Sequence, residues 1–473
     1  MLECRTKIVA TLGPATDTEG TLDRLLAAGV DCVRLNCSHG THEDLRRRYA
    51  ESRAAAERAG RPLGVLCDLQ GPKLRLSAAT VTRTFAAGDE VTFAGGEPGA
   101  TLDPDERRLI VEFPEFAELA TERSELVIGD GVPRFVVDRI YDGEVHARAL
   151  TPGPVSARKG VNVTYARPHL PAMTEKDVED VAVAAELGAD FVALSFVRGA
   201  ADVEMLREHL DRLGSKARTI AKIEKVEAYE HLDEILAVAD GVMVARGDYG
   251  VEAGVARVPL MQKDTIARAT QQGKVVITAT QMFESMISAP EPTRAEVADV
   301  ANAVIDGTSA VMLSGETSVG AYPVEAVRAM NEVATAAEES PVIHGAAKGD
   351  LAETSAAAVI HAAVKLADVL DAAALVIPTS SGGGVRACAK YRSRRPIIAL
   401  THDEQVACQL NLEWGVYPTA IELADSVDEL VESALVAARD FADLPSGCSV
   451  VLTAGRRTGT PGATSLVMVR EIP

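Results

Sequence analysis

A strand-helix unit that recurs along the chain limits its possible folds more than any other feature. Short apolar runs alternate with amphipathic helical patterns, as in parallel sheets built from successive strand-helix units. The candidate strands are 7–12, 31–35, 63–67, 190–194, 219–223, 241–245, 274–278 and 310–313, and the main helical patterns are 22–28, 42–59, 176–187, 203–213, 229–238, 259–272 and 294–305. Eight such strands are the number that a (β/α)8 TIM barrel requires, so the pattern predicts that α/β fold.

Polar residues follow these candidate strands, at the strand ends where barrels carry their chemistry. They are Asn36 and Ser38, Asp68, Ser195, Lys222 and Glu224, Asp248, Thr280 and Ser314. Lys222 and Glu224 are two positions apart and share a face of their strand, and Asp248 follows the next one. Two carboxylates beside a lysine suit Mg²⁺ with a phosphorylated ligand. An isolated Lys-x-Glu would be interpreted as a solvated strand end. Here several polar residues are expected on the same rim of the barrel, which favours a functional site.

Two further regions extend the predicted barrel. Between the third and fourth strands, short alternating runs punctuated by glycine turns predict an inserted all-β domain hinged at the rim, where a lid would exclude water. After about residue 340, strands and helices alternate again, which predicts a separate α/β domain. The expected division is a barrel of residues 1–73 and 168–340, a β lid of residues 74–167, and a C-terminal domain of residues 341–473.

Charge and composition restrict the partners of the chain. A net charge of −21 and a pI near 4.9 argue against nucleic acid and anionic membranes. A phosphate site must therefore concentrate positive charge locally, and Arg34, Arg75, Lys222 and Arg246 are candidates. The seven cysteines contain no C-x-x-C pair, no apolar run reaches membrane length, and no signal-peptide pattern opens the sequence. We expect a cytoplasmic protein.

Six motifs of the chain resemble those of pyruvate kinase, in family order and spacing. They are TKIVATLGPA at 6–15, VRLNCSHG at 33–40, AKIE at 221–224, ARGD at 245–248, TATQM at 278–282 and MLSGET at 312–317. The resemblance implies a (β/α)8 barrel with an inserted small β-barrel lid and a C-terminal α/β regulatory domain. It also implies transfer of the phosphoryl group of phosphoenolpyruvate to ADP, giving ATP and pyruvate in the last step of glycolysis.

The resemblance further implies a role for each site residue. Glu224 and Asp248 would hold Mg²⁺ or Mn²⁺, and Lys222 would neutralise charge on the phosphoryl group and the enolate. The amides of Ala245, Arg246, Gly247 and Asp248 would hold the substrate carboxylate, while Thr280 and Ser314 would relay the proton. The residues implied for phosphoryl or nucleotide contacts are Arg34, Arg75, Asn36, His39 and Lys159. A structural, hydrogen-bonded histidine remains the alternative for His39.

One departure from the family pattern concerns a monovalent cation. Many members hold K⁺ at a site whose matching positions here are Asn36, Ser38, Asp68 and Leu69, with a glutamate nearby where this chain has Lys73. A tethered ammonium can supply the positive charge that K⁺ otherwise brings. We therefore expect a K⁺-independent enzyme. The alternative is that Lys73 faces solvent on the hinge.

The C-terminal domain contains a candidate effector site. Thr379, Ser380, Ser381, Gly382 and Gly384 lie between a strand and a helix, and hydroxyls and free amides at a helix start hold phosphate well. The family uses this loop and a second one, matching residues 454–464 with Arg456 and Arg457, for a phosphorylated allosteric effector. The alternative is a simple glycine-rich turn. The family also suggests a homotetramer.

Two other functions remain open from the sequence. One is a different phosphoenolpyruvate-barrel enzyme, such as a mutase or lyase, which would lack the inserted lid. The other is a catalytically silent, metabolite-sensing family member, which should have lost Lys222, Glu224, Asp248 or Thr280. All four residues are present.

Overall fold

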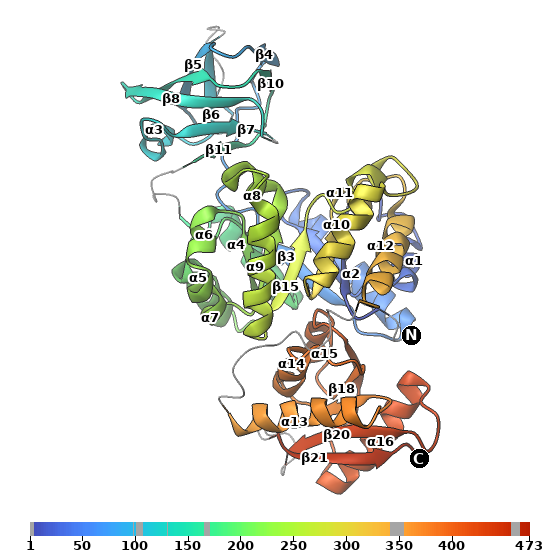
Figure 1. Ribbon diagram of the computed structural model, residues 1–473. Coiled ribbons are helices and arrows are strands. Elements are labelled where there is room, and N and C mark those ends of the chain that lie inside the picture. Colours follow the sequence, from blue (N-terminus) through green and yellow to red (C-terminus); the bar gives the residue numbers. More distant parts are fainter. Residues whose placement is uncertain are drawn as a thin grey trace.

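Three parts follow one another along the long axis of the molecule (Figure 1). The computed structural model describes residues 4–97, 99–100, 107–129, 131–164, 171–340, 354–455 and 464–473. The barrel lies in the middle, the inserted β segment lies at one of its ends, and the C-terminal domain lies at the other (Figure 1). No helix in these ranges combines the length and the apolar character needed to cross a bilayer.

The central part is a closed, all-parallel barrel, as predicted. Its strands are β1 (Lys7–Thr11), β2 (Cys32–Asn36), β3 (Gly64–Asp68), β12 (Phe191–Leu194), β13 (Arg218–Ile223), β14 (Gly241–Ala245), β15 (Val275–Ala279) and β16 (Ala310–Leu313). They pair in the order β1-β16-β15-β14-β13-β12-β3-β2, and β2 closes the ring on β1. Each predicted strand boundary agrees with the structure to within one residue, because these buried strands are short apolar runs with clear polar ends.

Helices surround the barrel. They are α1 (Thr21–Ala28), α2 (His42–Ala59), α4 (Glu175–Leu187), α5 (Ala200–Arg212), α6 (Val226–Glu230), α7 (Leu232–Val238), α8 (Arg246–Ala253), α9 (Val258–Gln271), α10 (Arg294–Ile305), α11 (Gly315–Ser318) and α12 (Pro323–Ala337), with the 3-10 turn η1 (Glu284–Ile287). Threonine capping boxes begin α2, α4 and α10. The single helix predicted at 229–238 is wrong, because the chain leaves helical geometry at His231 and separates α6 from α7.

The inserted segment is all-β apart from one helical turn. Its elements are β4 (Arg83–Phe85), β5 (Glu90–Gly95), β6 (Arg108–Val111), α3 (Phe116–Leu119), β7 (Glu125–Ile128), β8 (Arg134–Tyr141), β9 (Glu144–Ala149), β10 (Gly153–Val155) and β11 (Val161–Val163). The described ladders form a six-stranded sheet, β11-β7-β8-β9-β5-β6, and a two-stranded sheet, β10-β4. Both sheets share one core, in which Phe135 makes edge-on contacts with Phe85 and Phe93.

The C-terminal part is a five-stranded sheet with helices on both faces. Its elements are α13 (Ser355–Val369), β17 (Leu375–Pro378), α14 (Gly383–Ala389), β18 (Ile397–Thr401), α15 (Glu404–Leu410), β19 (Val416–Ala420), α16 (Val427–Ala442), β20 (Ser449–Gly455) and β21 (Thr464–Glu471). The strand order is β19-β18-β17-β20-β21, with only β21 antiparallel to its neighbour. Neither α15 nor β19 was predicted from the sequence. β19 contains Pro418, which an edge strand tolerates.

The turn between α15 and β19 closes the barrel at the end opposite the lid. Leu412 is fully buried and belongs to the same apolar cluster as the barrel-interior residues Phe191, Ile220 and Met243. Beside it, the Asn411 side-chain amide donates to the Pro62 carbonyl oxygen at 2.6 Å. The C-terminal domain therefore supplies part of the barrel core.

Candidate active site

Lys222 lies at the centre of a buried charge cluster on the lid-facing rim. Its Nζ is 3.2 Å from Asp68 Oδ1 and 3.1 Å from Glu224 Oε1, and both carboxylates are about 1% exposed. The ammonium also donates to Ser195 Oγ at 2.7 Å. These groups come from the ends of the adjacent strands β3, β12 and β13. The fold thus brings together rim residues that the sequence analysis proposed from strand ends alone.

Asp68 links this lysine to Arg34. Arg34 Nε donates to Asp68 Oδ2 at 2.7 Å, and its Nη1 donates to Thr11 Oγ1 at 3.1 Å. Burial alone would raise the pKa of Asp68, but the charges of Lys222 and Arg34 lower it below its usual value. Burial likewise opposes the charge of Lys222, yet Asp68 and Glu224 raise the pKa of Lys222. These opposite charges therefore favour the carboxylate form of Asp68 and the ammonium form of Lys222.

Glu224 and Asp248 are suited to a divalent cation. Glu224 Oε2 accepts the Phe196 amide at 2.8 Å. Burial raises the pKa of Glu224, and the nearby Asp248 carboxylate raises it further. The Lys222 charge lowers this pKa, but the net effect is an increase. A bound cation would relieve this excess of negative charge. Within the described ranges no three His, Cys, Asp or Glu side chains could hold a metal by themselves. Two carboxylates completed by substrate oxygens fit Mg²⁺.

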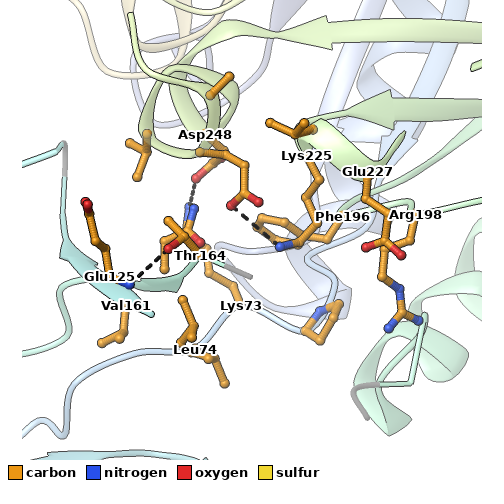
Figure 2. A pocket seen from close by; sticks show the side chains of 18 of the residues that line it. Lys73, Leu74, Glu125, Val161, Thr164, Phe196, Arg198, Lys225, Glu227 and Asp248 are labelled. Atoms are coloured by element: carbon orange, nitrogen blue, oxygen red, sulfur yellow. Dashed lines mark hydrogen bonds and ion pairs between the residues drawn. The ribbon is translucent and has the colours of Figure 1, made fainter. Parts of the chain in front are cut away.

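A cavity of about 650 Å³ lies between the lid and the barrel (Figure 2). Asp248 and Phe196 line it, whereas Lys222 and Glu224 are not among its lining residues. Figure 2 shows Lys73 and Asp248 pointing toward each other, and Lys73 Nζ is 3.0 Å from Asp248 Oδ1. The Lys73 ammonium also lies 5.9 Å from the centre of the Phe196 ring. Lys73 therefore lines the cleft, where its ammonium pairs with one of the two expected metal ligands.

The rim after β14 and β15 is tightly tied together. Thr280 has a left-handed φ of +68°, and its Oγ1 accepts the Gly247 amide at 2.8 Å. The Arg246 guanidinium donates to the Thr280 carbonyl oxygen at 2.7 Å and to Asp299 Oδ2 at 2.6 Å. Asp299 thus balances the Arg246 charge that the sequence analysis assigned to the phosphate site. The Arg246 side chain instead holds the loop that presents Thr280.

Ser314 lies on the next part of the rim, after β16. Its backbone amide donates to Glu316 Oε2 at 2.7 Å, and Glu316 Oε1 accepts the Phe283 amide at 3.0 Å. Glu316 is completely buried. This carboxylate fixes the Ser314 backbone to the segment that follows Thr280.

His39, one of the residues expected on the nucleotide side, lies in a positive region. Burial lowers the pKa of His39, and the charges of Arg75, Arg34 and Lys73 lower it further, so its imidazole is neutral. Asn36 Oδ1 accepts the Ser38 amide at 3.1 Å, which shapes the loop before α2.

Two other predicted residues border this region. Arg75 Nη1 donates to the Arg158 carbonyl oxygen at 3.2 Å. Arg158 directly precedes Lys159, so the Arg75 guanidinium lies close to the Lys159 backbone. Leu69 is at a position expected from the family pattern for a monovalent cation, and its carbonyl oxygen accepts a hydrogen bond from the Ser195 hydroxyl at 2.7 Å. Ser195 therefore connects this carbonyl to Lys222.

The predicted effector loop has the expected strand-loop-helix geometry. Thr379 Oγ1 accepts the Gly382 amide at 2.9 Å, and Gly382 has a φ of +78°. Arg386 donates to the carbonyl oxygen of Ser381. A Cβ at Gly384 would lie 3.5 Å from Thr464 Oγ1, so the end of the second predicted loop is close. Arg456 and Arg457 lie outside the described residues.

Comparison with known proteins decides the family. The family model "Pyruvate kinase, barrel domain" matches residues 3–327, and "Pyruvate kinase, alpha/beta domain" matches residues 357–470. The chain belongs to the pyruvate kinase family. The pyruvate kinase of Mycobacterium tuberculosis H37Rv is 40% identical over 99% of this chain and 98% of its own length. That of Geobacillus stearothermophilus is 40% identical over 99% of this chain and 80% of its own length.

Membership of the pyruvate kinase family fixes the reaction. The chain is a phosphotransferase of glycolysis that acts on phosphoenolpyruvate and ADP, gives pyruvate and ATP, and needs a divalent metal. The matches over both family domains do not favour the mutase or lyase alternative, and the intact rim does not favour a silent member.

Several contacts that shape this pyruvate kinase site were not assigned from the sequence. Ser195 stood among the strand-end residues, but its bond to Lys222 depends on the adjacency of β12 and β13. The Phe196 amide and Glu316 act through backbone hydrogen bonds, for which side-chain patterns give no signal.

Proposed function

We propose that Lys222, Glu224 and Asp248 form the phosphoryl-transfer centre of this pyruvate kinase. The observation that carries the proposal is the Lys222 ammonium, held between two buried carboxylates and beside Arg34 at the barrel rim. In this position the lysine is charged and fixed before substrate arrives. Preorganised charge of this kind contributes much of the rate in phosphoryl transfer.

Each side chain has a proposed part in the reaction. Lys222 and Arg34 offset negative charge on the transferring phosphoryl group, and Lys222 also stabilises the enolate oxygen. Amides at the start of α8, from Ala245 to Asp248, hold the substrate carboxylate, and the Gly247–Thr280 bond supports that turn. Thr280 and Ser314 lie on the rim after successive strands and relay the proton to the enolate carbon. Arg75, Asn36, His39 and Lys159 contact the nucleotide.

Glu224 and Asp248 are the proposed ligands of Mg²⁺, or of Mn²⁺ in its place. When bound, such an ion would neutralise negative charge on the substrate. The Lys73–Asp248 ion pair is partly exposed, with side chains 31% and 37% accessible, so metal binding can displace it at small cost.

Metal removal tests the proposed centre. Pyruvate release from phosphoenolpyruvate should require ADP and should fall to background when EDTA removes the divalent ion. Added Mg²⁺ or Mn²⁺ should restore the rate. A lactate dehydrogenase-coupled assay measures the release, with added pyruvate as the control for the coupling enzyme. Full activity in EDTA would contradict the role of Glu224 and Asp248.

We also propose that the enzyme does not need K⁺. Support comes from Lys73, whose ammonium lies in the cleft and contributes to the positive field at His39. Omitting K⁺ at fixed ionic strength should change kcat less than twofold. Lys73→Glu should lose most activity without K⁺ and regain part of it with K⁺, because a carboxylate there needs a counter-charge. A tenfold drop in the unaltered enzyme on omitting K⁺ would reject this proposal.

The regulatory and assembly proposals rest on the C-terminal domain and on the family. A phosphorylated effector is proposed to bind the loop of Thr379, Ser380, Ser381, Gly382 and Gly384, with Arg456 and Arg457 nearby. Saturation curves for phosphoenolpyruvate, measured with fructose bisphosphate, glucose 6-phosphate, ribose 5-phosphate and AMP, test it. If none of the four compounds changes the saturation curve, the loop would be a simple glycine-rich turn and not an effector site.

A homotetramer in the cytoplasm is the proposed state of the enzyme. The seven cysteines, all free thiols, support a reducing compartment. Light scattering of the purified enzyme would test the tetramer.

A further inference from the structure

The first turns of α4 contact both loops that lead to the nucleotide side of the site. Lys176 Nζ donates to the Cys37 carbonyl oxygen at 2.7 Å, in the loop between β2 and α2. Asp177 Oδ1 accepts the Gly71 amide at 3.0 Å, in the segment that leads through Lys73 to the lid. Gly71 has a φ of +69°, and a Cβ there would lie 2.9 Å from Ser195 and Phe196. The chain path beside α4 is therefore closely constrained.

The Lys176 ammonium is itself held in place. Asp180, one turn further along α4, has a side chain with no exposed area, and its Oδ2 lies 2.6 Å from Lys176 Nζ. Its other oxygen lies 2.8 Å from His42 Nε2, at the first position of α2. A continuous series of contacts thus joins the two ends of the loop formed by residues 37–41. It runs from His42 through Asp180 and Lys176 to the Cys37 carbonyl oxygen.

His39 belongs to this bridged loop, and the charges of Arg75, Arg34 and Lys73 act on its imidazole. An anionic ligand in that region needs the loop in one conformation. A loop ordered in advance loses less conformational entropy when the ligand binds, and the gain appears as affinity.

We propose that Lys176 is a positioning residue for ADP, which it serves by fixing the 37–41 loop through the Cys37 carbonyl oxygen. The inference rests on the proposed assignment of Asn36 and His39 to the nucleotide. Lys176 does not touch the reacting atoms, so its removal affects ADP binding more than the chemical step.

Steady-state kinetics of Lys176→Met, with each substrate varied separately, test the inference. We expect KM for ADP to rise about tenfold, equivalent to about 1.4 kcal/mol, with kcat and KM for phosphoenolpyruvate within twofold. Lys176→Arg keeps a charged donor and should return KM for ADP to within threefold of the original value. Should Lys176→Met fail to fold, Asp180→Asn makes the same test by loosening the ammonium, with a smaller rise.

The matched control is Arg46→Met. It breaks the other ion pair between α2 and α4, Arg46–Glu186, whose side chains are 43% and 57% exposed and take no part in the contacts that bridge the loop. KM for ADP should not change. An unchanged KM for ADP in Lys176→Met, or an equal rise for both substrates, would overturn the inference.

His39→Ala, measured in parallel, separates this result from the nucleotide assignment. If His39→Ala raises KM for ADP and Lys176→Met does not, only the positioning role fails. If His39→Ala alters KM for phosphoenolpyruvate alone, the assignment of the loop to the nucleotide fails.

Discussion

Lys222→Met should lower kcat by about three orders of magnitude, with the fold intact. Removing one preorganised charge from a transferring group lowers rates by about 10²–10³-fold, and Lys222 is proposed to serve both the phosphoryl group and the enolate. The methionine side chain fills much of the volume of the lysine methylene groups. The substitution therefore removes the cation beside Asp68 and Glu224 without opening a cavity. The coupled assay for pyruvate measures the loss, and circular dichroism verifies the fold.

Lys274→Met is the control for that substitution. Lys274 lies at the opposite end of the barrel, just before β15, where its Nζ donates to the Ala239 carbonyl oxygen at 2.8 Å. Its removal should leave kcat within twofold. Lys222→Arg should remain impaired, because a planar guanidinium cannot occupy the position of the ammonium between two carboxylates and Ser195. Retention of a tenth or more of kcat in Lys222→Met would contradict the proposed role.

Asp68→Asn should lower the free energy of unfolding by about 3 kcal/mol, because it leaves two buried cations with one carboxylate fewer. The Lys222 and Arg34 side chains are only 12% and 11% exposed, so water cannot replace the lost charge. Urea unfolding, followed by fluorescence of Trp414, the single tryptophan, measures the change.

The same variant should alter the pH profile. Asp68 raises the pKa of Lys222 against the effect of burial, so its neutralisation lowers that pKa. Lys222 then loses its proton at lower pH, and the alkaline decline of kcat should move to lower pH.

Asp23→Asn is the matched control for stability. It removes the exposed Asp23–Arg58 pair, whose side chains are 43% and 57% accessible, and should leave the free energy of unfolding nearly unchanged. Equal effects of the two substitutions would contradict the buried-charge argument.

The barrel could be predicted from the sequence because each of its strands is an apolar run with a polar end, and only a ring brings all those ends together. The lid ladders and α15–β19 could not be predicted in the same detail. The lid strands are short and their pairing is non-local, while β19 carries Pro418 and α15 has only seven residues.

The interaction partners of the rim side chains were harder to predict than the location of these residues at strand ends. Lys222 and Glu224 are close in sequence, and their shared face was evident. The pairings Arg34–Asp68, Lys73–Asp248 and Lys176–Cys37 join residues far apart in the chain, and the last uses a backbone carbonyl. Asp68 was expected at a monovalent-cation site of the family that Lys73 replaces in this chain, and in the structure its two carboxylate oxygens lie beside Lys222 and Arg34.

The position of Leu412 inside the barrel limits how the barrel and the C-terminal domain of this enzyme can be exchanged between relatives. Its side chain packs with Phe191, Ile220 and Met243 inside the barrel, although it is encoded with the C-terminal domain. A chimera that joins this barrel to a relative's C-terminal domain would inherit a foreign residue in its own interior. Grafted regulation should therefore succeed only when the α15–β19 turn is retained from the parent barrel or both sides are redesigned together.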